Sequence, residues 1–202
     1  MSTPAHLKIL EEAEALADKG DCARALPMCD RVLSKDSEDA AALTLKGRCL
    51  TELGRPKEAL PCYKLARLFL PSYSPVRYNL GKALAEAGDS DGALAEFNEA
   101  LNIDAGNQSA LSARAALLSA RGDHKGALSD CDELMRRNPD NPSWRMMWGR
   151  CLLAANRLPE AKREFDLLLS MRTKWTDEIY RLSWGKLQLD PNAGQDEPHG
   201  PL

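Results

Sequence analysis

The sequence has no excess of positive charge and no long hydrophobic run. Its 27 lysine and arginine residues are outnumbered by 30 aspartate and glutamate residues, which gives a formal net charge of -3. Nucleic-acid-binding domains usually carry a clear basic excess, so no nucleic-acid partner is expected. No stretch approaches the roughly 18 apolar residues of a membrane span, and the N-terminus lacks the basic and apolar regions of a signal peptide. We expect a soluble, cytoplasmic protein without membrane insertion.

Motifs that bind metals, nucleotides or cofactors are also missing. The six cysteines include no CxxC pair, and the three histidines are scattered along the chain, which argues against a zinc site. The sequence contains no P-loop, GxSxG or HExxH motif and no GxGxxG after a strand. Carboxylates are plentiful, but at helix-surface spacing such groups are usually solvated. The sequence therefore predicts a protein that is not an enzyme, with no catalytic residues, no metal and no cofactor.

The sequence does contain internal repeats with a period of 34 residues. The stretch LAEAGDSDGALAEFNEAL, residues 84–101, resembles LSARGDHKGALSDCDELM, residues 118–135. We number the repeat positions from His6 as position 1. Position 15 is then glycine or asparagine and position 20 is alanine in all five copies: Gly20, Gly54, Gly88, Gly122 and Asn156, then Ala25, Ala59, Ala93, Ala127 and Ala161. Self-similarity at a period of this length is typical of stacked supersecondary units.

Each copy predicts two helices joined by a tight turn. Position 15 suits a backbone with positive φ, which glycine and asparagine tolerate best. Small residues at positions 8 and 20 let the two helices approach closely. Cys29 and Cys131 are separated by 102 residues, as are Cys49 and Cys151, and this distance is three periods. We interpret these cysteines as small apolar core residues, with metal or redox chemistry as the alternative.

Alanine at position 20, aromatic residues at position 24 (Tyr63, Phe97 and Phe165) and the Gly-Asp turn resemble the tetratricopeptide repeat family over about residues 6–175. The resemblance implies an all-α, right-handed superhelical solenoid of about five helix-turn-helix repeats. We expect these repeats at 6–39, 40–73, 74–107, 108–141 and 142–173. A frayed N-terminus (1–5), a C-terminal capping helix (174–190) and a disordered tail (191–202) should flank them. The family has a bulky aromatic at position 4, whereas this chain has Ile9, Leu43, Arg77, Leu111 and Arg145, which should weaken individual repeats.

In the family, the first helix of each repeat lines a concave groove. The resemblance implies a peptide-binding groove lined by residues Arg48, Tyr78, Lys82, Ser112, Met146 and Arg150. Position 9 carries Arg48, Lys82 and Arg150, a basic row that would contact a carboxylate, a phosphopeptide or an acidic segment. In the alternative interpretation, Arg48 and Lys82 pair with Glu52 and Glu86, four residues on, and attract nothing. Arg150 has Ala154 at that distance instead.

The resemblance implies a non-catalytic adaptor or scaffold that holds a peptide or helix of a partner protein. Two alternatives stay open: a co-chaperone or secretion-type chaperone, and a self-assembling structural module. Some relatives bind the C-terminal carboxylate of heat-shock chaperones through a clamp with lysine at position 5 and asparagine at position 9. The second repeat has Thr44 and Arg48 at these positions and does not satisfy the clamp. No other repeat of the chain satisfies it either.

Overall fold

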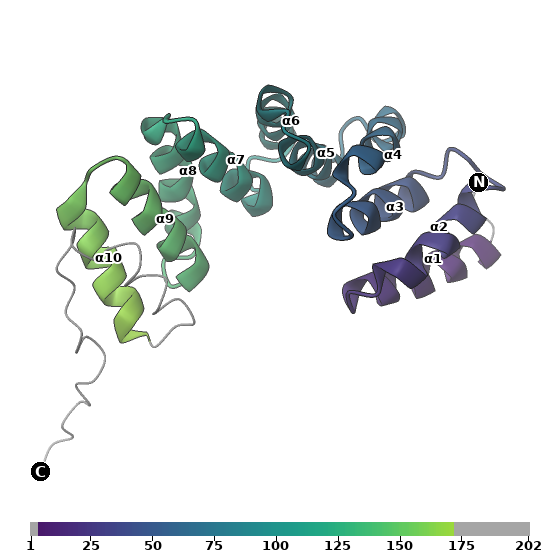
Figure 1. Cartoon of the computed structure of the whole chain (residues 1–202), viewed down its shortest axis with the longest axis horizontal. Helices are drawn as coiled ribbons and strands as arrows, with labels where there is room; N and C mark the ends of the chain where they lie inside the picture. The colour runs from purple at the N-terminus through teal and green to yellow at the C-terminus, as the bar shows by residue number, and fades with distance from the viewer. Residues whose placement is uncertain (1–3, 172–202) are drawn as a thin grey trace, which may run out of the picture. The chain divides into compact units, whose positions relative to one another are not determined.

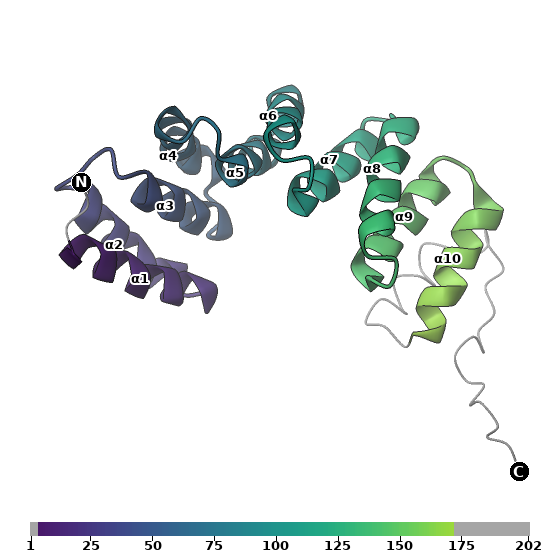
Figure 2. The ribbon, with the colours of Figure 1, turned by 180° about the vertical axis from the view of Figure 1, so that it is seen from behind.

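The computed structural model describes residues 4–171, which form ten α-helices and no strand (Figures 1 and 2). Consecutive helices pair into five hairpins: α1 (Pro4–Asp18) with α2 (Cys22–Leu33), α3 (Ala40–Glu52) with α4 (Pro56–Phe69), α5 (Ser74–Glu86) with α6 (Ser90–Ile103), α7 (Gln108–Ala120) with α8 (His124–Arg137), and α9 (Pro142–Ala154) with α10 (Leu158–Ser170). Within 4–171, no helix is both long and apolar enough to cross a membrane. The expected capping helix and tail lie outside the described residues.

The chain divides into two compact units, residues 1–110 and residues 111–202. The first unit holds α1 to α6, and the second holds nearly all of α7 together with α8, α9 and α10. Each unit has its own buried cluster of apolar side chains, one around Ala13, Cys29 and Cys49 and the other around Ala115, Cys131 and Phe165. All six cysteines are buried and free, which agrees with their interpretation as core residues.

The turn inside each hairpin depends on position 15. The backbone φ is positive there in every repeat, at 80° for Gly20, 72° for Gly54, 94° for Gly88, 84° for Gly122 and 58° for Asn156. These five are the positive-φ residues within the described part of the chain. The repeat pattern therefore predicted the turn conformation correctly, because only residues that tolerate left-handed backbone occur there.

Size matching sets how closely the two helices of a hairpin approach. A Cβ atom added at Gly81 on α5 would lie 2.7 Å from the Phe97 ring on α6. The same conflict, at 2.7 Å and 2.5 Å, would arise between the other such pairs, Gly47 with Tyr63 and Gly149 with Phe165. Where position 8 is alanine instead, position 24 is cysteine: Ala13 with Cys29 and Ala115 with Cys131. A large residue at position 24 thus accompanies glycine at position 8, and a small one accompanies alanine.

The arginines at position 4 have carboxylate partners in the second helix of their own hairpin. Arg77 Nη1 lies 3.1 Å from Glu96 Oε2, and Arg145 forms an ion pair with Glu164 in the same way. Glu96 also pairs with Arg67 on α4, so it joins the second hairpin to the third. Both acids occupy position 23, which the family pattern does not single out. Asp130 occupies position 23 of the fourth repeat, where position 4 is Leu111, and it pairs with Arg114 instead. An acid at position 23 therefore accompanies an arginine on the first helix, at position 4 in two repeats and at position 7 in the fourth.

Candidate peptide-binding faces

The first helices of unit 1 are neighbours in space, since α3 contacts both α1 and α5. Arg48 extends from α3 to α1, where its Nη2 lies 3.0 Å from Asp18 Oδ1. This partner is 30 residues earlier in the chain, and it replaces Glu52, the partner expected from helical spacing. Glu52 instead accepts a hydrogen bond from the Cys22 thiol at 2.9 Å. The Arg48 side chain is 32% exposed, so its charge is only partly available to a ligand.

Tyr78 and Lys82 share one side of α5. Lys82 Nζ lies 3.9 Å from Glu86 Oε1, the i,i+4 pair of the alternative interpretation, and both side chains are exposed. Such surface pairs contribute only about 0.3–0.5 kcal/mol, so Lys82 can exchange its partner at little cost. The half-buried Tyr78 ring rests against Phe97, with ring centroids 6.2 Å apart. A ring fixed in this way offers apolar area at a low cost in conformational entropy.

The predicted residues of unit 2 are less uniform. Ser112 on α7 is half-buried and Arg150 on α9 is exposed. Met146 was expected to be an apolar anchor, and the structure corrects this expectation. Its side chain is only 4% exposed and belongs to the buried cluster around Phe165 and Leu152. A thioether that fills the core cannot also contact a ligand, so Met146 stabilises α9 rather than lining a groove.

The unit 1 face has mixed charge. Asp18 and Glu86 offset Arg48 and Lys82, and the same side of the first helices also exposes Glu14. A purely basic row is therefore not what a ligand would meet. An acidic segment would have to displace carboxylates that are already present, whereas a segment of mixed charge could match both signs. The ammonium group of Lys82 remains available to a ligand, whereas the Nε and Nη2 atoms of Arg48 are buried.

A recess of about 450 Å³ lies elsewhere in unit 1, between α2, α3 and α4. Its floor is apolar, with Leu43, Leu50 and Cys62, and a Lys46–Asp30 ion pair of 2.6 Å lies at its wall. Hydrogen bonding to Asp30 raises the pKa of Lys46, so the pair stays ionised. This recess was not predicted from the sequence, because its lining residues come from two repeats and share no periodic pattern.

Among the described residues, no group of three or more histidine, cysteine, aspartate or glutamate side chains could hold a metal ion. Two cysteines do come together in unit 2, where the Cys131 thiol donates a hydrogen bond to Cys151 Sγ at 3.7 Å. Sequence spacing had matched Cys131 to Cys29 and Cys151 to Cys49 three periods earlier, but it did not bring Cys131 and Cys151 together.

Comparison with known proteins agrees with the repeat pattern. Two tetratricopeptide repeat models match, one over residues 10–75 and 64–110 and the other over residues 118–182. Rat DnaJ homolog subfamily C member 3 is 33% identical over 99 residues, which cover 49% of this chain and 20% of that protein. The human protein is 32% identical over the same length. The chain thus spans about a fifth of the length of these curated relatives.

Solved structures show the same architecture. A tetratricopeptide repeat protein from Parabacteroides merdae matches with a TM-score of 0.74 and 22% identity, over 89% of this chain and 74% of its own. YrrB, described as a tetratricopeptide repeat protein with an unusual peptide-binding site, matches with a TM-score of 0.69 and 19% identity over 86% and 89%. These likenesses confirm the all-α fold predicted from the repeats. The chain belongs to the tetratricopeptide repeat family.

Proposed function

We propose that this chain is an adaptor or scaffold that binds a peptide or helix of a partner protein on the exposed face of its first helices. Tetratricopeptide repeat proteins are generally non-catalytic scaffolds, and their fold is that of a protein-interaction module. The face is built on packed helices, so it is preformed, and ordering on binding falls mainly on the ligand.

The observation that carries this proposal is the Tyr78 ring, held against Phe97, on the same side of α5 as the exposed and exchangeable Lys82–Glu86 ion pair. Phe97 fixes the tyrosine ring, while Arg48 and Lys82 hold donors on the same set of helices, α3 and α5. An apolar anchor flanked by charged groups is the usual composition of a peptide-binding surface. The face would take a segment with one apolar side chain and charged neighbours, including acidic ones that compete with Asp18 and Glu86.

The test compares charge reversal on the two sides of the hairpins. Arg48→Glu, Lys82→Glu and Arg150→Glu alter the first helices, and Arg31→Glu, Lys57→Glu and Lys125→Glu make the same charge change on second helices. We expect a partner captured from native extract to be lost with the first set and retained with the second. Tyr78→Ala should weaken the same interaction without changing charge.

The reverse pattern would place the binding surface on the second helices and refute the proposed face. Because Arg48→Glu also puts two acids together at Asp18, each variant should first show wild-type helicity by circular dichroism. Loss of binding in a variant that remains folded then reports on the face itself.

The match to DnaJ homolog subfamily C member 3 favours a second candidate, a co-chaperone that binds unfolded segments. This candidate predicts that the chain slows the aggregation of an unrelated protein diluted from denaturant. An adaptor for one folded partner would have no such effect. A third possibility is a self-assembling module, whose mass would grow with concentration. Light scattering across a range of concentrations distinguishes such a module from the adaptor and from the co-chaperone.

A further inference from the structure

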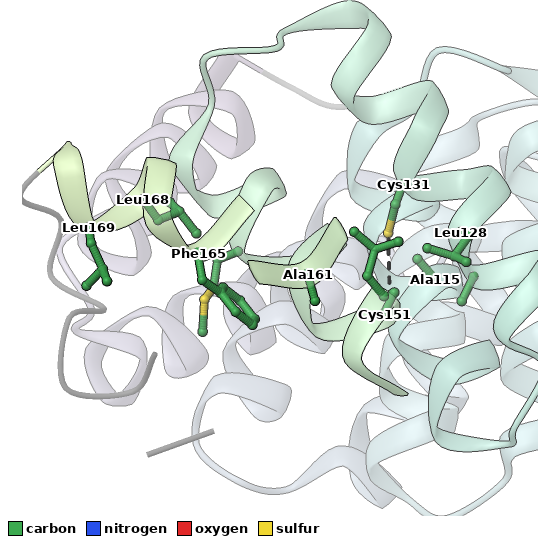
Figure 3. Close-up of a cluster of buried hydrophobic side chains, with 11 residues drawn as sticks. Ala115, Leu128, Cys131, Cys151, Ala161, Phe165, Leu168 and Leu169 are labelled. Carbon is green, nitrogen blue, oxygen red and sulfur yellow. Dashed lines mark hydrogen bonds between the residues drawn. The ribbon is translucent and has the colours of Figure 1, made fainter. Parts of the chain in front are cut away.

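Cys131 on α8 and Cys151 on α9 bring two thiols into one buried contact between the fourth and fifth hairpins. Their sulfur atoms are 3.7 Å apart, and the dashed line in Figure 3 joins them. The side chains are only 1% and 2% exposed. Their surroundings are apolar, with Leu128 and Ala161 in the same cluster. Packing alone explains a small residue at each position, but it does not require two sulfur atoms in contact.

We propose that Cys131 and Cys151 are a redox-active pair, which a peroxide converts to a disulfide that joins α8 to α9. A disulfide bond is about 2.05 Å long, so the sulfur atoms must approach by about 1.7 Å. Rotations of the two side chains about their Cα–Cβ bonds would have to supply this movement. The bond would close a loop over residues 131–151 and fasten two neighbouring hairpins of unit 2 to each other.

The chemistry needs one hydrogen peroxide molecule for each disulfide. The Cys151 thiolate attacks one peroxide oxygen and the O–O bond breaks, which leaves a sulfenic acid on Cys151. The departing hydroxide takes up the proton released by Cys151 and becomes water. Cys131 then attacks the sulfenic sulfur, and its proton leaves with the sulfenic hydroxyl as a second water. Two electrons pass from the thiols to the peroxide, and no other reactant is required.

The hydrogen bond assigns the roles within the pair. The Cys131 thiol donates the hydrogen bond and Cys151 Sγ accepts it. This hydrogen bond lowers the pKa of Cys151 and raises the pKa of Cys131. The positive charge of Arg150 adds to the lowering at Cys151. The thiolate is the nucleophile in such reactions, so Cys151 should react first and Cys131 should resolve the sulfenic acid.

The remaining cysteines provide a comparison within the same chain. Cys29 and Cys49 occupy the same repeat positions as Cys131 and Cys151, three periods earlier. Burial raises the pKa of Cys29 to about 11, and burial also raises the pKa of Cys49. Burial together with a hydrogen bond to Glu52 raises the pKa of Cys22 to about 12. Cys151 combines a lowered pKa with a second sulfur atom 3.7 Å away, so we expect oxidation at this pair first.

Burial of the two thiols limits their access to an oxidant. The pair is sealed while α8 and α9 are packed, so a small oxidant reaches it when the fifth hairpin opens locally. Once formed, the disulfide would oppose that opening. The rate of oxidation would therefore depend on how often the fifth hairpin separates from α8. The disulfide, once formed, would prevent further separation.

The test uses the full chain treated with hydrogen peroxide, then alkylated in denaturant and cleaved with trypsin. We expect a linked product of peptides 126–136 and 151–157 that a thiol reductant releases. Cys29→Ala is the matched control, with a substitution at the same repeat position, and should leave the linked product unchanged. Cys131→Ala should abolish it and send Cys151 on to sulfinic acid.

Two readouts guard against a folding defect in the variants. Circular dichroism should show wild-type helicity for both alanine variants, and the peroxide-treated wild type should melt several degrees higher than the reduced protein. Recovery of both thiols as separately alkylated peptides after peroxide would overturn the proposal. So would a disulfide that joins either residue to one of the other four cysteines.

Discussion

Gly81→Ala tests whether size matching at positions 8 and 24 holds the third hairpin together. The new Cβ would lie 2.7 Å and 2.8 Å from two Phe97 ring atoms and 3.2 Å from the Ala93 carbonyl oxygen. Phe97 is 1% exposed and rests against Tyr78, so the ring has little room to move. Overpacking of this kind costs about 1–3 kcal/mol. Alanine in a helix interior recovers about 1 kcal/mol relative to glycine, so we expect a net loss of about 1 kcal/mol.

The assay is urea unfolding followed by far-UV circular dichroism, in a double-mutant cycle with Phe97→Cys. The Phe97→Cys background reproduces the alanine–cysteine combination found at Ala13 and Cys29. In that background Gly81→Ala should stabilise the chain by up to about 1 kcal/mol, because the clash with the Phe97 ring is gone and the helix preference of alanine remains. The contact with the Ala93 carbonyl oxygen at 3.2 Å also remains and requires only a small shift. Equal effects of Gly81→Ala in both backgrounds would refute the size-matching explanation. So would stabilisation by Gly81→Ala in the wild-type chain.

Three further predictions concern single residues. Asn156→Ala should lower stability by about 1 kcal/mol in thermal denaturation, because φ is 58° there, whereas Asn156→Gly should not. Glu96→Gln removes the charge between two arginines and should cost about 1.5–3 kcal/mol in urea unfolding, while the exposed Glu99→Gln should have little effect. Hydrogen bonds from two arginines lower the pKa of Glu133 below its ordinary 4.5, so its stabilisation is present above that pH and is lost as pH falls through the lowered pKa. The melting temperatures of the wild type and Glu133→Gln should therefore converge in acid.

The features predicted well from the sequence are those that depend on a residue and its neighbours in one hairpin. A positive φ at position 15 is a local property of glycine or asparagine, and Gly88 and Asn156 both show it. The close approach of helices follows from the absence of a side chain, as at Gly47 beside Tyr63. Both signals recur at the same place in each repeat, so the period revealed them.

The features predicted poorly depend on contacts between hairpins. Helical spacing offered Glu52 as the partner of Arg48, but the stacking of α1 on α3 brings Asp18 closer to the guanidinium. Met146 occupies a position that faces the groove in the family, yet its side chain fills the core of unit 2. Neither outcome follows from the period, because both depend on how one helix is rotated against its neighbours.

Size matching also limits which parts of the chain could be exchanged by recombination. Moving α7 into the place of α5 would set Ala115 against Phe97 and produce a clash, and the reciprocal move would set Gly81 against Cys131 and leave a void. Transfer of a whole hairpin avoids both defects, since each hairpin carries its own matched pair. The smallest portable segment of this chain is therefore two helices, and a crossover inside a hairpin would produce a less stable protein even though every helix came from the same repeat family.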